Sequence, residues 1–273
     1  MADPSYRGLR RSVAVVACLV CAAALLTGSP AAGKVRDTPL RVLQMNLCDS
    51  GIARCYTGRS VPEAAAVIRA EAPDLVTLNE VCADDVYLLD RALAGVHPGG
   101  TVVSAFQAAA DRRTAGAFRC RNGQPYGIGL VAHLPVPSGG YPTYRGIYPI
   151  QDSRDPEERA WLCLWASTYF YACTTHLAST SPTVALAQCR YLLDKVIPRV
   201  PAPAVLAGDL NLRYGGVPDV RSCVPSGYLR MDDGAVQHVV ATSDFTAGSS
   251  RSIDMDGATD HPGLLVTLTI VGQ

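Results

Sequence analysis

The first third of the chain alternates short apolar runs with amphipathic segments, and this alternation restricts the possible folds more than any other feature. The run Leu40 to Leu47 (LRVLQMNL) predicts a strand because it is short and ends at a polar stretch. A helix is expected over Val61 to Ala72, with Pro73 as a stop. The pattern then repeats as a strand over Asp74 to Val81 and a helix over Asp84 to Leu93. Strand, helix, strand, helix is typical of an α/β sheet.

The rest of the chain predicts further strands and one more helix. The helix is expected over Thr183 to Val196, which has apolar residues at helical spacing. Strands are expected over Thr101 to Phe106, Ile128 to Ala132, Trp161 to Ala166, Thr168 to Thr175, Ala204 to Ala207, His238 to Thr242 and Leu264 to Ile270. Because no Gly/Ser-rich or Pro-rich linker interrupts this order, we expect one domain over residues 33–273. Its expected architecture is two mixed sheets packed together with helices outside.

The N-terminus has the pattern of a secretory signal peptide over residues 1–32. Arg7, Arg10 and Arg11 precede the uncharged stretch Ser12 to Leu26, and small residues follow as far as Ala32. A membrane-spanning helix is the alternative, but this stretch is shorter than the roughly 20 residues that a bilayer requires. We therefore expect a secreted mature chain with no transmembrane anchor.

Charge and composition exclude several classes of protein. The 24 basic and 24 acidic side chains cancel, and removal of residues 1–32 leaves a small acidic excess. A protein that grips duplex phosphates without sequence preference usually has a basic excess, which this chain lacks. With 48% hydrophobic and 18% charged residues, the chain can bury a sizeable core and does not have the composition of a disordered or fibrous protein.

The cysteines agree with export. An even number in an exported chain favours disulfides, although eight cysteines allow 105 pairings. We predict two local pairs, Cys48 with Cys55 across a short loop and Cys163 with Cys173 in adjacent strand-like runs. A thiolate metal site is the alternative, but the CxxC spacing that such sites use is missing from the mature chain. The cysteines beyond residue 32 are Cys48, Cys55, Cys82, Cys120, Cys163, Cys173, Cys189 and Cys223.

Polar side chains stand where several predicted strands end, which is where α/β folds place their sites. Taken singly, each has an ordinary structural interpretation. An asparagine can shape a turn, an aspartate can cap a helix, and a lone histidine is usually part of a hydrogen-bonded core. Taken together, they supply groups that can hold a hard cation or a phosphate. They are Asn46, Glu80, His176, Asp209, Asn211, Asp260 and His261.

In their order along the chain, these residues resemble the endonuclease/exonuclease/phosphatase superfamily. The matching strings are RVLQMNL, PDLVTLNEV, CTTHL, AVLAGDLN and TDHPGLLVTL. The superfamily includes pancreatic-type deoxyribonucleases, apurinic endonucleases, inositol-phosphate phosphatases and bacterial sphingomyelinases. The resemblance spans Leu40 to Ile270, and five motifs in family order are far more specific than any one of them.

The resemblance implies a fold, a cofactor and a role for each residue. The fold is a four-layer α/β sandwich of two mixed β-sheets flanked by helices. The reaction is attack of water on a phosphate ester with Mg²⁺, or Mn²⁺ or Ca²⁺ in its place, since oxygen ligands suit such ions. Asp209 would orient or deprotonate the water, Asn211 would fix that carboxylate or a phosphate oxygen, and His176 and His261 would donate hydrogen bonds to the phosphoryl group. The metal ligands would be Asn46, Glu80 and Asp260.

One position departs from the family pattern. Relatives commonly carry an aspartate before a late strand, in a string like DYIL, where it orients the second histidine. Here the comparable string is QHVVATSDF, which puts His238 at that position. His261 would then lack its usual carboxylate or use another aspartate, the candidates being Asp232, Asp233, Asp254 and Asp256. Tyr126 lies near where some relatives contact phosphate, although an ordinary packed tyrosine would give the same pattern.

These features predict a secreted, metal-dependent phosphoesterase, expected to be a monomer. The substrate class is a phosphate ester, with nucleic acid the first candidate and a phospholipid of the sphingomyelin type another. A disulfide-stapled binding module that has kept the fold and lost turnover is an alternative from a different class. A serine hydrolase ranks last, because the chain has no GxSxG string.

Overall fold

The first sheet is built around a parallel pair of strands. β1 (Pro39–Asn46) and β2 (Leu75–Cys82) are joined by helix α1 (Ser60–Glu71), as a parallel crossover requires. The order is β14-β15-β1-β2-β6-β3, and every other neighbouring pair is antiparallel. The additional strands are β3 (Thr101–Ala108), β6 (Tyr126–Leu134), β14 (Phe245–Ile253) and β15 (Gly263–Ile270).

The second sheet repeats this plan. β10 (Phe170–His176) and β11 (Ala204–Asp209) are its parallel pair, and helix α3 (Pro182–Tyr191) lies between them in the chain. The order is β12-β13-β11-β10-β9-β7. The strands that flank this pair are β7 (Thr143–Ile147), β9 (Ala160–Ala166), β12 (Leu229–Asp232) and β13 (Gln237–Ala241). A small third sheet contains β4 (Ala110–Asp111), β5 (Gly116–Ala117) and β8 (Glu157–Glu158).

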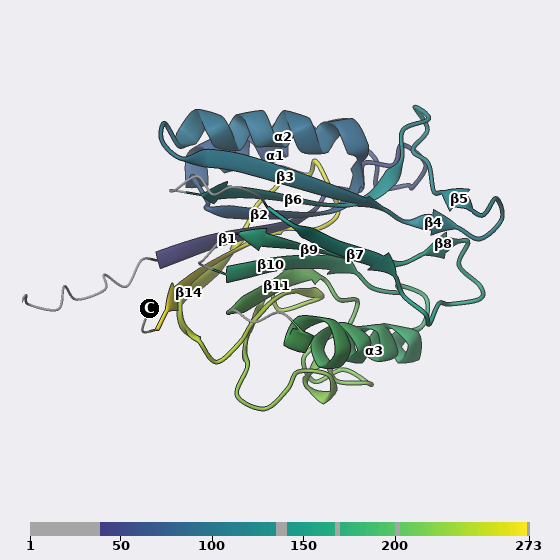
Figure 1. Cartoon of the computed structure of the whole chain (residues 1–273). Coiled ribbons are helices and arrows are strands. Elements are labelled where there is room, and N and C mark those ends of the chain that lie inside the picture. Colours follow the sequence, from purple (N-terminus) through teal and green to yellow (C-terminus); the bar gives the residue numbers. More distant parts are fainter. Residues whose placement is uncertain (1–38, 135–140, 167–169, 200–202, 272–273) are drawn as a thin grey trace, which may run out of the picture. The chain divides into compact units, whose positions relative to one another are not determined.

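Helices and sheets form four layers (Figure 1), and three apolar clusters lie between them. The first lies between the two sheets and includes Leu130, Leu162 and Val266. The second joins the outer face of the second sheet to α3, and the third joins the first sheet to α1 and α2 (Ala83–Val96). The strands of the parallel pairs are covered on both faces, which explains their continuous apolar runs. The predicted α/β sandwich of two mixed sheets is thus confirmed.

Local backbone and capping features explain where α3 begins and where α1 ends. Ser181 caps α3 by accepting a hydrogen bond from the Val184 amide (3.4 Å), and Pro182 stands in its first turn. After α3 the chain continues as a π-helical turn and then a 3₁₀ turn, as far as Arg199. Helix α1 ends where Ala72 adopts a left-handed backbone.

Four disulfides pair the eight cysteines. The two predicted pairs, Cys48–Cys55 and Cys163–Cys173, are confirmed. The others join segments farther apart in the chain, Cys82–Cys120 and Cys189–Cys223. Since every one of these sulfurs is bonded to another, no thiolate remains among them to bind a metal.

This computed structural model describes residues 39–134, 141–166, 170–199 and 203–271. The predicted signal peptide over residues 1–32 lies outside these ranges. Arg36–Gln273 form one compact unit. In the described part of the chain, no helix has both the length and the apolar character needed to span a membrane.

Candidate active site

The strand ends predicted to carry the site lie at one edge of the two sheets. In the parallel pair β1 and β2, Asn46 is paired with Asn79, and in β10 and β11, His176 is paired with Asp209. Glu80 follows Asn79 directly. Because parallel strands end at a common edge, each sheet presents polar side chains there, and the contacts below show that the two sets meet.

Asn46 joins a carboxylate of the first sheet to one of the second. Its Nδ2 donates to Glu80 Oε1 (2.9 Å) and to Asp209 Oδ2 (3.1 Å). Its Oδ1 accepts from the Cys48 amide at 3.1 Å. The side chain is buried, so this one amide group fixes the separation of two acidic groups that are far apart in the chain.

Glu80 lies in a β-bulge and has a left-handed backbone. Its φ is +54°, and the register between β2 and β6 shifts between Asn79 and Val81. A non-glycine residue in this conformation costs roughly 1–3 kcal/mol. The bulge interrupts the alternation of side chains between the two faces of β2 at Glu80, the one residue of this strand that is not buried. Its carboxylate thereby reaches Asn46, and Oε1 lies 3.9 Å from Nε2 of His176.

Asp209 is held by hydrogen bonds through both its backbone and its side chain. Its amide donates to Asn79 Oδ1 (2.7 Å), and its Oδ1 accepts from the Asn211 amide (2.9 Å). Burial raises the pKa of Asp209 to about 6, and the nearby His261, Asn211 and Asn46 partly oppose that rise. A carboxyl group that gains and loses a proton near neutral pH is suited to general-base chemistry.

Asn211 also contacts the second sheet through its side chain. Its Nδ2 donates to the Leu177 carbonyl at 2.9 Å, directly after His176. The residue has a left-handed backbone, with φ of +49°, a conformation that asparagine tolerates better than most residues. Asn211 therefore links the ends of β10 and β11 while its backbone amide fixes the Asp209 carboxylate.

Arg159 determines which nitrogen of His176 carries the proton. Its Nη1 lies 2.8 Å from His176 Nδ1, and since a guanidinium can only donate, Nδ1 must be the acceptor. Burial, and after it the charge of Arg159, lowers the pKa of His176 well below its ordinary value. The ring is therefore neutral at neutral pH and presents Nε2–H on the side that faces Glu80.

The loop between β14 and β15 supplies the last two predicted residues. His261 Nε2 lies 3.8 Å from Asp209 Oδ2 and 3.8 Å from Asp260 Oδ1. The Thr259 hydroxyl donates to the Asn46 carbonyl (3.0 Å) and so attaches the loop to the end of β1. The His261 side chain is 24% exposed, so solvent and substrate can reach it.

His238 does not occupy the place beside His261 that the family pattern suggests. Its Nε2 donates to the Leu212 carbonyl (2.7 Å), and its Nδ1 lies 3.3 Å from Nη1 of Arg230. The residue is fully buried. Its imidazole therefore serves the packing of the second sheet, and the carboxylates near His261 are Asp209 and Asp260.

Gln237, and not His238, is the residue of β13 that contacts the loop between β14 and β15. It is paired with Asp209 across β11 and β13, and its amide nitrogen donates to the Pro262 carbonyl. Neighbouring residues of a strand face opposite sides, which explains why Gln237 and not His238 points this way. The pattern of the sequence had not singled out this glutamine.

The comparison with known families agrees with this geometry. The sequence matches the model of the "Endonuclease/Exonuclease/phosphatase family" over residues 58–261, which is more than half of the chain. The chain belongs to the endonuclease/exonuclease/phosphatase family. A search of curated proteins gave no match.

Solved structures of this family have the same fold. An endonuclease/exonuclease/phosphatase from Beutenbergia cavernae DSM 12333 is 24% identical, with a TM-score of 0.65, and the match covers 86% of this chain and 72% of that chain. The human Nocturnin catalytic domain with bound sulfate is 15% identical, with a TM-score of 0.63, covering 87% and 95%. Humanized D. rerio TDP2 is 18% identical, with a TM-score of 0.54, covering 84% and 98%. At these identities the likeness shows the fold alone.

A groove of about 450 Å³ opens beside the candidate site in this family member. Its wall includes Glu80, His176, Arg159, Tyr126, Phe118 and Arg154. Burial and then the charge of Glu157 raise the pKa of Tyr126, so its hydroxyl stays protonated beside Glu80. Arg159 was not predicted, and the signal that could have revealed it is a run of charged residues directly before the apolar run of β9.

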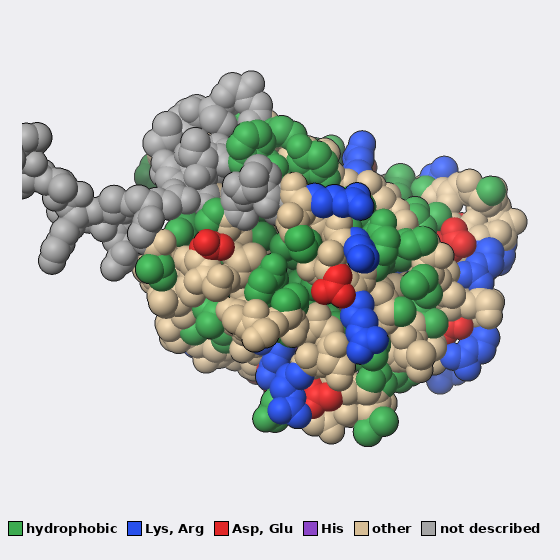
Figure 2. Space-filling model, turned by 60° about the horizontal axis from the view of Figure 1, so that its bottom comes forward, with side chains coloured by type: hydrophobic (Ala, Val, Ile, Leu, Met, Phe, Trp, Pro, Cys, Tyr) green, Lys and Arg blue, Asp and Glu red, His purple; other side chains and the backbone are tan. Residues whose placement is uncertain are grey.

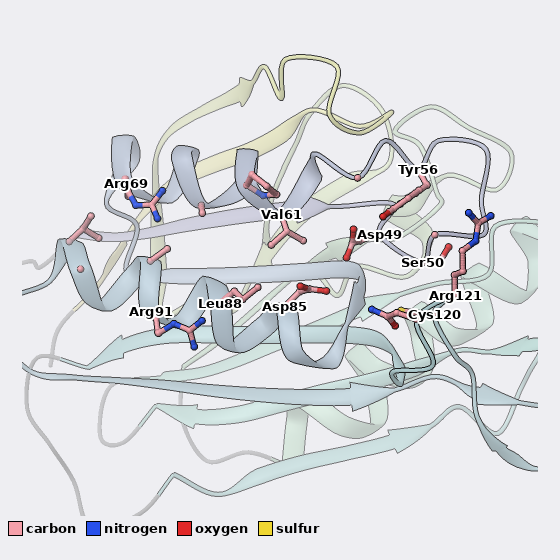
Figure 3. Close-up of a pocket in the computed structure, with 18 residues that line it drawn as sticks. Asp49, Ser50, Tyr56, Val61, Arg69, Asp85, Leu88, Arg91, Cys120 and Arg121 are labelled. Carbon is pink, nitrogen blue, oxygen red and sulfur yellow. The ribbon is translucent and has the colours of Figure 1, made fainter.

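A larger cavity, of about 870 Å³, lies between α1, α2 and the Cys120 loop (Figure 3). The carboxyl groups of Asp49 and Asp85 point toward one another in it. Burial raises the pKa of Asp49 to about 7, and the hydrogen bond with Asp85 adds to the rise. Ser50 borders this cavity and the groove, so the loop after β1 divides the two.

Proposed function

We propose that this chain is a secreted, divalent-metal-dependent phosphodiesterase that acts on nucleic acid. The observation that carries the proposal is the convergence of carboxylates, an amide and two imidazoles from both sheets at one place. Members of this family are hydrolases of phosphate esters and generally use divalent metal ions.

The donor set fits a hard cation. Glu80 and Asp260 would hold the ion, with Asn46 beside them, since Mg²⁺ and Ca²⁺ prefer oxygen ligands. The charge of Glu80 raises the pKa of Asp209, so the two carboxylates repel one another and a cation would relieve that repulsion. One lone pair of Asn46 Oδ1 accepts from the Cys48 amide, and the other could serve as a ligand. When bound, the ion supplies neutralising charge to the phosphate ester and acidifies water.

The remaining residues supply the proton transfer and the hydrogen bonds of hydrolysis. Asp209 would accept the proton of the attacking water, while the Asn211 amide keeps its carboxylate in place. His176 would donate from Nε2 to a phosphoryl oxygen, the tautomer being set by Arg159. His261 would donate from the other side, 3.8 Å from the Asp209 carboxylate. Donors fixed in this way stabilise charge that develops on the phosphoryl oxygens.

Aromatic and guanidinium groups near the groove support a nucleic acid substrate. Phe118 lines the groove, and the Arg113 guanidinium lies 5.6 Å from the centre of its ring. Arg119 lies in the neighbouring hollow of the small third sheet. Base stacking with nearby phosphate contacts is the usual mode of single-strand binding. Basic and acidic side chains balance in the whole chain, which favours a short or single-stranded substrate over long duplex DNA, and the two kinds are interspersed on the face shown in Figure 2.

Secretion is the remaining part of the proposal. Four disulfides in one chain of this size are typical of an oxidising compartment. The N-terminal pattern of three arginines and an uncharged stretch supports the same conclusion. Mass spectrometry of protein recovered from the medium of an expressing cell should find an N-terminus close to residue 33, and retention of the whole chain inside the cell would contradict export.

The activity is tested by hydrolysis assays on the purified chain with Mg²⁺, Mn²⁺ or Ca²⁺. Single-stranded DNA, RNA, sphingomyelin and bis(p-nitrophenyl) phosphate are compared with and without EDTA. We expect EDTA-sensitive cleavage of a nucleic acid, and we expect Glu80→Gln and Asp209→Asn to lower it by at least about 100-fold. Cleavage of sphingomyelin alone would refute the nucleic acid assignment.

The matched control is Asp194→Asn, which neutralises an exposed carboxylate on the π-helical turn after α3. It should keep full activity. If no substrate is cleaved with any metal while the protein still binds oligonucleotides, the binding-module alternative replaces the proposed enzyme. Loss of activity in Asp194→Asn equal to that in Glu80→Gln would mean that the assay reports stability and not chemistry.

A further inference from the structure

Two stacked histidines and an aspartate lie together at the opposite end of β2 from Glu80. His97 follows α2 and His133 lies near the end of β6, with ring centroids 3.9 Å apart and planes 8° from parallel. One ring nitrogen of each histidine and one carboxylate oxygen of Asp74 lie within 4.8 Å of one another. Asp74 precedes Glu80 by six residues, which is roughly 20 Å along an extended strand. This cluster is therefore separate from the candidate active site.

The backbone fixes the position of Asp74 without any ligand. Its amide donates to the Arg41 carbonyl (2.9 Å), and its own carbonyl accepts from the His133 amide (2.8 Å). Its Oδ2 accepts from the Arg41 amide at 2.8 Å. Among the described residues, no hydrogen bond is made to Oδ1, so one carboxylate oxygen is available at a rigid place in the sheet.

The hydrogen bonds of the two rings determine their tautomers. His97 Nε2 lies 2.8 Å from the Pro73 carbonyl, and His133 Nε2 lies 2.7 Å from the Gly99 carbonyl. A carbonyl can only accept, so both Nε2 atoms carry hydrogen, and a neutral ring then has its lone pair on Nδ1. An imidazole that binds a metal through one nitrogen usually donates the other N–H to a carbonyl or a carboxylate in this way.

We propose that Asp74, His97 and His133 bind a transition-metal dication such as Zn²⁺, through Oδ1 and the two Nδ1 atoms. Two imidazoles and one carboxylate are a common protein set for this ion, with water as the fourth ligand. Metal–ligand bonds are about 2.0–2.1 Å long. To form them, the two imidazole rings must rotate out of their parallel stacking so that both Nδ1 atoms point at the ion. All three side chains are partly exposed, which leaves room for that rotation. The ion would tie the α2–β3 connection to the start of β2, independently of the proposed function.

The site is tested with the full chain and Zn²⁺ by isothermal titration calorimetry in the presence of excess Mg²⁺. The double variant Glu80→Gln/Asp209→Asn removes the carboxylates of the candidate active site, so that Zn²⁺ bound there does not obscure the result. In this background we expect one Zn²⁺ per chain. Adding His97→Gln, His133→Gln or Asp74→Asn should weaken that binding by on the order of 10–100-fold or more.

Asp84→Asn is the matched control, because it neutralises an exposed carboxylate in the first turn of α2, and it should leave Zn²⁺ binding unchanged. Co²⁺ provides a readout that needs no substitution, since coordination by the two imidazoles should give the intense visible absorption of a tetrahedral site. Absence of Zn²⁺ binding in the double variant, or binding that His97→Gln and His133→Gln leave intact, would overturn the proposal.

Discussion

The carboxyl pair in the larger cavity gives a sharp test of the electrostatics. Asp49 faces Asp85, and its Oδ1 accepts from the Ser60 hydroxyl at 3.3 Å. Burial and the neighbouring acid raise the pKa of Asp49 from 3.8 to about 7. Asp49→Asn keeps the size of the side chain and the hydrogen bond to Asp85, and it removes the charge. We expect this variant to be more stable than the native chain above neutral pH.

The sign follows from proton linkage. The folded chain holds a proton on Asp49 up to about pH 7, whereas the unfolded chain releases it near pH 4. The stabilising contribution is therefore complete below pH 4 and is lost as the pH rises through 7. A shift of this size corresponds to at most about 4 kcal/mol, and since Asp49 is only partly buried, solvent screening reduces it to about 1–2 kcal/mol.

The measurement is the free energy of unfolding in urea at several pH values between 4.5 and 8.5. Asp49→Asn should match the native chain at the acidic end and exceed it by about 1–2 kcal/mol at pH 8. Asp194→Asn, an exposed carboxylate elsewhere, should follow the native pH dependence. If Asp49→Asn shows the native slope across the whole range, the carboxyl pair does not share a proton and the argument is refuted.

Three further changes test the site and its supports. Arg159→Met should lower kcat by on the order of 10–100-fold and raise the pKa of His176, because the neighbouring positive charge is lost; an unchanged pH–rate profile would contradict this effect of the Arg159 charge. Asn79→Leu should lower the unfolding free energy by about 2–4 kcal/mol, since Asn79 is buried and bonded to both sheets; urea unfolding measures this, and a loss under 1 kcal/mol would argue against such a link. Replacing Cys82 and Cys120 together by serine should cost about 4 kcal/mol by the chain-entropy estimate for a separation of 38 residues, and an unaltered Tm would show that the bond is dispensable.

In the two large sheets, the strands that the sequence does not predict are edge strands. They are β7, β12 and β14. β14 (FTAGSSRSI) is exposed along most of its length, so it has no apolar pattern and is held by backbone pairing with β15. Edge strands are often polar for this reason. The inner strands were predictable because burial on both faces leaves a continuous apolar run.

The sequence predicts those residues of the candidate site that stand at the ends of strands. Asn46, His176 and Asp209 end strands that the pattern had located, and the family order of motifs then placed them together. Arg159 could not be found in this way, because it does not end a predicted strand and its role comes from a contact across 17 residues with the histidine that ends β10. The assignment of His238 depended on register, where a difference of one residue reverses the face of the side chain.

Two asparagines explain why the candidate site and the junction of the sheets coincide. Asn79 accepts from the Asp209 amide and donates to the Thr175 carbonyl, so its side chain joins the sheets just behind the carboxylates. Asn46 joins Glu80 to Asp209 in front of it. Glu80, whose backbone is strained, follows Asn79 directly in the chain and accepts the hydrogen bond from Asn46. Strain persists only where the surroundings fix a residue from several sides, and the packing of the two sheets provides that support. The geometry of the candidate site is therefore stabilised by the same core that stabilises the fold.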